Sequence, residues 1–123
     1  WMLAAAFAPA GHDDAFRFLP YVADAGGAVR EVPEVATRWR AHLPLDMLAA
    51  DTAALRGTSV AIDYGAGDQI PSVVAGSRAF SALLTERGIT HTVSEFDGDH
   101  VGSVRVRFHT ALLPFFARAF ADR

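Results

Sequence analysis

The chain has 123 residues, of which 51% are hydrophobic and 20% are charged, and its formal net charge is −3. This composition excludes an intrinsically disordered chain, because disorder requires low hydrophobicity and high net charge. The length suits one domain or a large part of one. A mildly acidic sequence without a basic stripe is also a poor candidate for binding nucleic acid.

The sequence contains no cysteine, which excludes disulfides, thiolate nucleophiles and zinc–sulfur sites. No apolar run reaches the roughly 18 residues of a membrane helix. The longest run, Met2–Ala10, is short and lacks the basic flank of a signal peptide. We therefore expect no membrane association. The compartment stays open, with the cytoplasm favoured over secretion.

The sequence opens with an apolar stretch, Trp1–Ala8, which is typical of a buried segment. A natural domain rarely begins inside its core, so we expect an amino-terminal part upstream of Trp1. Within this stretch, Met2–Ala8 is apolar throughout and is followed by Pro9 and Gly11. This pattern favours a central parallel strand that is buried on both faces.

Residues 11–57 form a predicted insert, similar to a lid, that precedes the second half of the chain. Gly11–Arg30 is expected to be irregular because proline, aspartate and glycine interrupt it. Pro33–His42 is a predicted helix with proline at its first position. A second short helix is predicted over Asp46–Arg56, with Asp46 as its cap.

Residues 58–123 alternate strand, helix, strand and helix. The predicted ranges are Thr58–Tyr64, Ser72–Arg87, Thr90–Phe96 and Gly102–Ala121. Pro114 is expected to kink the last helix, because proline removes one backbone hydrogen bond and crowds the preceding turn. Such alternation implies parallel strands joined by right-handed crossovers. The predicted fold class is α/β, with about three roughly parallel strands and flanking helices.

Two polar loops follow the predicted strands of this second half. Asp68 lies after Thr58–Tyr64, and His100 lies after Thr90–Phe96. Parallel neighbouring strands place such loops side by side at the carboxyl edge of the sheet, where ligands bind. A carboxylate beside a histidine fixes the imidazole tautomer, and the other ring nitrogen can then take a proton from a hydroxyl nucleophile. The order of acid before histidine is that of α/β-hydrolases.

Four ordered segments are similar to the end of bacterial esterases of the α/β-hydrolase superfamily, related to the esterase D and feruloyl esterase group. They are Asp63–Asp68, Gly88–Ile89, Phe96–His100 and Leu113–Phe116. The similarity covers residues 58–120, whereas residues 1–57 resemble the family more loosely. The resemblance implies that residues 1–123 are the carboxyl-terminal portion of such a domain. It also implies that Asp68 is the acid and His100 the base of a catalytic triad.

The sequence departs from this family because it lacks the G-x-S-x-G turn that carries the nucleophile. Ser77 follows Gly76, but it lies inside a predicted helix and has no flanking pair of glycines. We therefore expect no esterase turnover from this chain alone. In the intact protein, a serine would attack a small-molecule ester with the help of Asp68 and His100, and no cofactor would be needed.

Other polar residues are weaker candidates. His12 with Asp13 and Asp14 could suggest a metal site, but no second ligand pair has suitable spacing, so a solvated loop is favoured and no metal is predicted. His12 remains a candidate for substrate binding. Trp39 either lines the pocket or anchors the insert, and the sequence leaves both open.

Asp68 could instead cap the following helix, and His100 could be an ordinary loop histidine. Asp63 is expected to pair with a neighbouring group, and Asp97 and Asp99 are expected to form turns.

One alternative belongs to a different class: a non-catalytic remnant that binds itself through an exposed sheet edge, or binds the missing amino-terminal half. A second alternative keeps the fold and changes the reaction to that of a peptidase or a dehalogenase.

Overall fold

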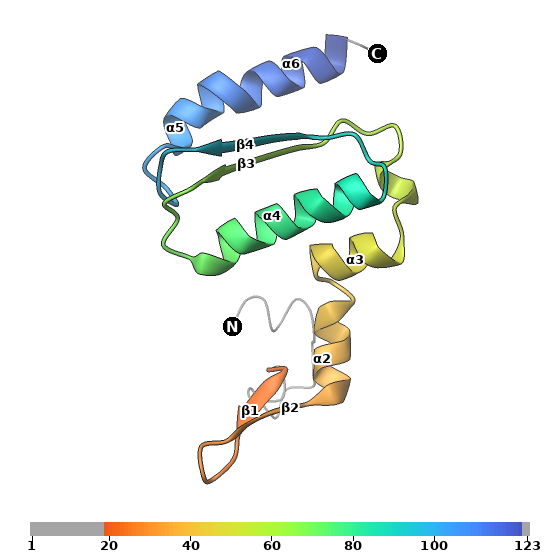
Figure 1. Ribbon diagram of the computed structural model, residues 1–123, viewed down its shortest axis with the longest axis vertical. Helices are drawn as coiled ribbons and strands as arrows, with labels where there is room; N and C mark the ends of the chain where they lie inside the picture. Colours follow the sequence, from red (N-terminus) through yellow and green to blue (C-terminus); the bar gives the residue numbers. More distant parts are fainter. Residues whose placement is uncertain (1–18, 122–123) are drawn as a thin grey trace, which may run out of the picture. The chain divides into compact units, whose positions relative to one another are not determined.

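The computed structural model describes residues 19–121 (Figure 1). The chain divides into two compact units at the junction of Ala50 and Asp51. The predicted strand Met2–Ala8 and the candidate residue His12 lie outside the described residues.

The first unit contains an antiparallel hairpin of β1 (Tyr21–Ala23) and β2 (Val29–Glu31). The prediction of an irregular stretch up to Arg30 was therefore wrong for this part. The Asp24 carboxylate accepts hydrogen bonds from two backbone N–H groups in the connecting loop, at 2.8 and 2.9 Å. Aspartate favours turns through such bonds. Strands of three residues are too short to show a clear alternation of apolar and polar side chains.

Two helices follow the hairpin: α2 (Pro33–Arg40) and α3 (Pro44–Ala50). The predicted helix at Pro33 is confirmed, with proline in its first turn. Asp46 was wrongly predicted as a cap, because α3 begins two residues earlier, at another proline, and Asp46 lies within its first turn. Among residues 19–50, the buried apolar side chains are Val35, Ala36 and Leu48.

The second unit begins with a 3₁₀ turn and then alternates strand and helix. Its elements are η1 (Ala53–Leu55), β3 (Ala61–Gly65), α4 (Pro71–Glu86), β4 (Thr92–Phe96), α5 (Val104–Arg107), η2 (Phe108–Leu112) and α6 (Leu113–Ala121). Strands β3 and β4 pair in parallel. Figure 1 shows α4 on one side of this pair and α5–α6 on the other. The described residues thus combine helices with a parallel sheet of two strands, as an α/β chain does. These are the two strands that the sequence predicts after residue 57, whereas the third predicted strand, Met2–Ala8, lies outside the described residues.

Helix α4 joins the two strands and packs against the sheet through apolar residues. Leu84 is fully buried, and Tyr64 and Ile89 are also buried. Gly88 follows the end of this helix with a positive φ of 67°, which suits glycine, and the N–H of Ile89 bonds back to the carbonyl of Leu84 at 2.9 Å. The predicted helix over Ser72–Arg87 is confirmed to within one residue at each end.

Polar side chains also connect α4 to the face of the sheet against which it packs. Tyr64 and Glu95 are opposite each other in the register, and the Tyr64 hydroxyl donates to the Glu95 carboxylate at 2.6 Å. Arg78 of α4 donates two hydrogen bonds to that carboxylate, at 2.6 and 3.1 Å. These bonds, the one from Arg78 most strongly, hold the pKa of Glu95 below its ordinary value. Glu95 therefore links a strand and a helix while it remains ionised.

The helix predicted over Gly102–Ala121 is observed without a break from Val104 to Ala121, but the sequence did not predict the π-helical turn within it. It consists of α5, a five-residue π-helical turn (η2) and α6. Pro114 lies at the start of α6 and has no N–H to donate back to Thr110. The π-helical turn ends two residues before Pro114 and includes Thr110, whose carbonyl would otherwise accept this hydrogen bond.

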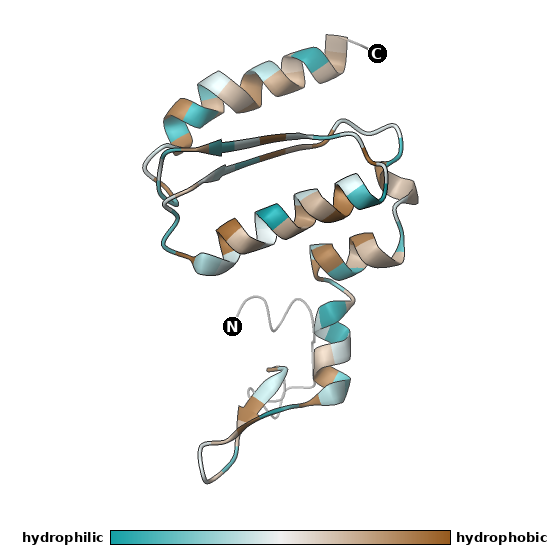
Figure 2. Cartoon of the chain, viewed as in Figure 1, coloured by the Kyte–Doolittle hydropathy of each residue, from teal (hydrophilic) through white to brown (hydrophobic). Residues whose placement is uncertain are grey.

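Figure 2 shows hydrophobic positions along α5, η2 and α6. Several of the large apolar side chains at these positions are exposed. The exposed large residues there are Val104, Val106, Phe108, Leu112, Leu113, Phe116 and Phe120. Within residues 19–121, no helix combines the length and the apolar character that crossing a bilayer requires.

Candidate catalytic site

The loops that follow β3 and β4 lie against each other, because their backbones continue the parallel ladder beyond the strands. The N–H of Ala66 donates to the carbonyl of Phe96 at 2.8 Å, and the N–H of Gly67 donates to the carbonyl of Gly98 at 2.9 Å. Both loops leave the carboxyl ends of their strands, so their polar residues share one edge of the sheet.

Asp68 and His100 meet at this edge. The Nδ1 atom of His100 lies 2.7 Å from Oδ2 of Asp68, and the N–H of Ile70 donates to Oδ1 of Asp68 at 2.8 Å. Only 3% of the Asp68 side chain is exposed, against 44% of the His100 side chain. The carboxylate is thus held in place by two hydrogen bonds, while the imidazole remains accessible.

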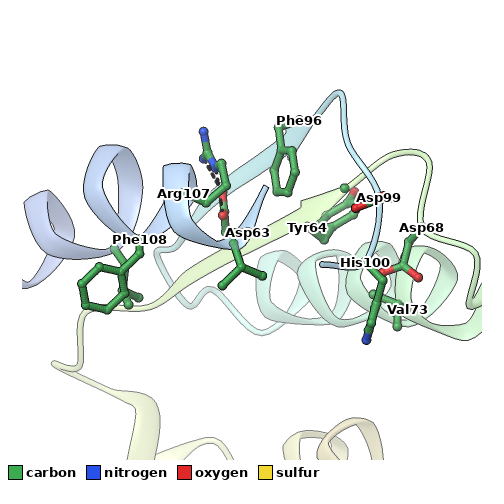
Figure 3. A pocket seen from close by; sticks show the side chains of 12 residues that line it. Asp63, Tyr64, Asp68, Val73, Phe96, Asp99, His100, Arg107 and Phe108 are labelled. Carbon is green, nitrogen blue, oxygen red and sulfur yellow. Dashed lines mark hydrogen bonds and ion pairs between the residues drawn. The ribbon is translucent and has the colours of Figure 1, made fainter. Parts of the chain in front are cut away.

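This arrangement fixes the tautomer of His100. An ionised carboxylate only accepts hydrogen bonds, so the proton lies on Nδ1 and the lone pair of the neutral ring lies on Nε2. Figure 3 shows one ring nitrogen pointing away from Asp68. His100 can therefore accept a proton at Nε2 while the hydrogen bond from Nδ1 to Asp68 keeps the imidazole in place.

The pKa of Asp68 is lowered from its ordinary value. The hydrogen bond from His100 is the main cause, and the N–H of Ile70 adds to it, whereas burial acts in the opposite direction. Asp68 is therefore ionised at neutral pH and can stabilise a protonated imidazole. Its Oδ1 atom accepts the N–H of Ile70, the residue before α4. This contact forms a local turn, and it is not the helix cap that the sequence also allowed.

A cavity of about 360 Å³ adjoins the pair (Figure 3). Its wall contains Asp68 and His100 from the two loops. Its apolar lining comes from both layers of helices and from β4: Val73, Phe96, Val104, Phe108 and Leu112.

Arg107 lies in the wall of this cavity, but its charge is compensated. Its Nε atom donates to Asp63 at 3.0 Å, and its Nη2 atom donates to the other Asp63 oxygen and to the Ser94 hydroxyl, the latter at 2.8 Å. Its guanidinium also stacks 4.8 Å from the ring centre of Phe96. The Asp63 hydrogen bonds raise the pKa of Arg107, so the ion pair persists at neutral pH. The cavity wall therefore suits a neutral group better than an anion.

The predicted minor roles can be compared with these contacts. Asp63 pairs with a neighbouring side chain, as predicted, although nothing in the sequence indicated that the neighbour is Arg107. Asp99 forms a turn, as predicted, because its Oδ1 accepts the N–H groups of Val101 and Gly102. The Asp99 contacts shape the loop that carries His100.

The structure also contains a serine–histidine pair that sequence analysis missed. The His91 Nδ1 atom lies 2.9 Å from the carbonyl of Ile89, so Nδ1 donates and Nε2 accepts the Ser81 hydroxyl at 2.8 Å. His91 precedes β4, whereas His100 follows it, so the two histidines belong to opposite ends of the strand. Ser81 lies inside α4 and not at a strand-to-helix turn. We interpret this pair as a tether between α4 and the entry to β4.

Across residues 19–121, no three histidine, aspartate or glutamate side chains cluster as a metal site. Trp39 is half-buried on α2 in the first unit. The roles proposed for His12 and Trp39 in substrate binding stay predictions.

No protein-family model matches this sequence, and no curated protein matches it. The functional argument therefore depends on the geometry of the site and on the residues that form it.

Proposed function

We propose that this chain supplies the acid and the base of a carboxylic-ester hydrolase, with Asp68 as the acid and His100 as the base. The observation that carries this proposal is the 2.7 Å contact between an exposed imidazole and a nearly buried carboxylate. The sequence has no G-x-S-x-G turn, so the nucleophilic serine would come from residues outside these 123.

In the proposed reaction, the serine hydroxyl attacks the acyl carbon while His100 takes its proton at Nε2. Asp68 stays ionised and stabilises the imidazolium that forms. His100 then gives this proton to the departing alcohol, which leaves an acyl-enzyme. In the second half, His100 takes a proton from water as the water attacks the acyl carbon, and returns it to the serine. This sequence of steps requires no cofactor.

The lining of the cavity favours a neutral ester with an apolar substituent as the substrate. Its lining is largely apolar, and the positive charge of Arg107 is paired with Asp63. A peptidase would use the same acid and base, whereas a dehalogenase would use an aspartate as the nucleophile. The identity of the nucleophile would separate these alternatives.

Ester turnover in a polypeptide that includes both this sequence and the nucleophile tests the proposal. We expect Asp68→Asn to lower kcat by roughly 10⁴-fold, because the imidazole loses its orienting carboxylate. His100→Ala should lower kcat at least as much. Asp97→Asn and His109→Ala, which change exposed residues of the same types, serve as controls. Normal turnover in His100→Ala would refute the proposal.

A second candidate function is self-association. Within the described residues, β3 and β4 pair only with each other, and apolar side chains of η2 and α6 are exposed. Unpaired strand edges and exposed apolar surface drive association. If the chain acts as such a module, the sedimentation coefficient rises with concentration, and Phe116→Lys reverses this rise. A coefficient that is independent of concentration would exclude this function.

A further inference from the structure

We propose that Gly65 is a positioning residue for the Asp68–His100 pair. Because Gly65 has no side chain, the His100 loop can approach the end of β3 closely enough for the imidazole to reach the carboxylate. The effect of Gly65 on the Asp68–His100 distance does not depend on any reaction. Its effect on catalysis rests on the proposed function.

The evidence is the space around Gly65. A Cβ atom at this position would lie 2.3 Å from the carbonyl oxygen of Gly98 and 2.8 Å from that of Asp99. Cβ atoms essentially never approach other heavy atoms within 3.0 Å. The obstructing atoms belong to the backbone, so no side-chain rotation can relieve the overlap. Any larger residue would force the two loops apart.

Backbone conformation does not explain this glycine. The described glycines with positive φ are Gly27, Gly57 and Gly88, and Gly65 is not among them. Gly65 is the last residue of β3 and is paired with Phe96 in the parallel register. Any residue can adopt an extended conformation of this kind. The requirement at position 65 is therefore for space and not for flexibility.

The close approach is linked directly to the pair. The Gly98 carbonyl, which would meet the added Cβ atom, accepts the N–H of Gly67 at 2.9 Å. Gly67 immediately precedes Asp68, and Gly98 lies two residues before His100. A displacement of the Gly98 carbonyl therefore moves both partners of a 2.7 Å bond. Hydrogen bonds weaken steeply when such distances and angles change.

Three glycine-to-alanine substitutions in the full chain form a graded test. In Gly65→Ala the new Cβ atom would meet backbone at 2.3 Å, and in Gly67→Ala it would meet the Gly98 carbonyl at 3.2 Å. In Gly76→Ala, within α4, it would meet no heavy atom within 4 Å. There are two readouts: the NMR resonance of the His100 Nδ1 proton, and the pKa of the Asp68 carboxyl. The pKa is measured by isotope-edited NMR titration.

We expect Gly65→Ala to abolish the hydrogen-bonded Nδ1 resonance and to raise the pKa of Asp68 towards its ordinary value. Gly67→Ala should shift both readouts partway, and Gly76→Ala should leave both unchanged. A structural role alone would lower stability without ordering the variants in this way.

A folded Gly65→Ala variant with both readouts unchanged would overturn the inference. If Gly65→Ala does not fold, Gly67→Ala decides: unchanged readouts in that variant overturn the inference equally. This outcome is distinct from failure of the proposed function. If Gly65→Ala uncouples the pair but Asp68→Asn leaves ester turnover intact, the positioning stands and the hydrolase proposal falls.

Discussion

The two oxygens of Asp68 have different partners, and this division explains why a single residue can serve a turn and a histidine together. Oδ1 accepts the N–H of Ile70, which fixes the carboxylate relative to the start of α4. Oδ2 accepts the Nδ1 proton of His100. The carboxylate is therefore already oriented before any substrate binds, as acid–base catalysis requires.

The lowered pKa of Asp68 predicts a definite pH dependence of stability. A carboxyl group whose pKa falls on folding stabilises the fold above its unfolded pKa, and this contribution is lost as the pH falls through the folded pKa. Asp68→Asn should therefore reduce the free energy of unfolding at neutral pH. The difference from the unsubstituted chain should shrink in acid, below the ordinary pKa of 3.8. Urea unfolding at a series of pH values measures it, with Asp97→Asn as the control. A difference that stays constant down to strong acid would contradict this prediction.

A second prediction concerns the ion pair in the cavity wall. Asp63→Asn removes the negative charge that compensates Arg107, while the amide keeps the shape of the side chain. The variant should then bind a small carboxylate such as benzoate, whereas the unsubstituted chain should not. Chemical shift changes at Arg107 and His100 during titration with benzoate measure this binding. Equal binding by both proteins would show that the ion pair does not control the charge of the cavity.

The sequence predicted the meeting of Asp68 and His100 but not the pairing of Asp63 with Arg107. The first pair follows from topology, because the carboxyl ends of adjacent parallel strands place their loops together. The second pair depends on which face of α5 lies towards the sheet, and its two residues are 44 positions apart in the sequence. No local pattern determines that orientation. The same holds for Ser81 and His91, whose contact depends on how α4 packs.

Among the elements, α4 contributes most clearly to the core of the second unit. Leu84 is fully buried there, so Leu84→Ala should lower the free energy of unfolding by about 2–5 kcal/mol, through lost burial and the cavity left behind. Leu113→Ala, at a position with 46% exposure, should cost considerably less. Urea denaturation of both variants measures the difference. Equal costs would mean that α4 is not packed against the sheet as described.

Helices α2 and α4 and strands β3 and β4 were predicted well, whereas the bounds of α3, the hairpin and the π-helical turn were not. Helices α2 and α4 begin at prolines, and α4 keeps an apolar stripe over four turns. The hairpin of β1 and β2 was missed because its strands have three residues each. The π turn was missed because apolar spacing alone does not distinguish it from a continuous helix. Tertiary context and backbone hydrogen bonding decide such details.

For the molecule as a whole, the α/β character was predicted from the alternation of strands and helices, and the parallel pairing of β3 and β4 agrees with it. The two parallel strands predicted within the described residues are both present, and the third predicted strand stays a prediction because it lies outside those residues. Parallel sheets are normally covered on both faces and extend over more strands. Within residues 19–121, β3 and β4 pair only with each other, which agrees both with a nucleophile outside this chain and with self-association.

A fluorophosphonate probe, which reacts with activated serines, tests the central claim most directly. It should be applied to this 123-residue chain and to a polypeptide that includes both this sequence and the nucleophile. We predict that the longer polypeptide is labelled at one serine, that His100→Ala abolishes this labelling, and that the 123-residue chain is not labelled, even at Ser81. Labelling of the 123-residue chain, or labelling of the longer polypeptide that persists in His100→Ala, would contradict the account.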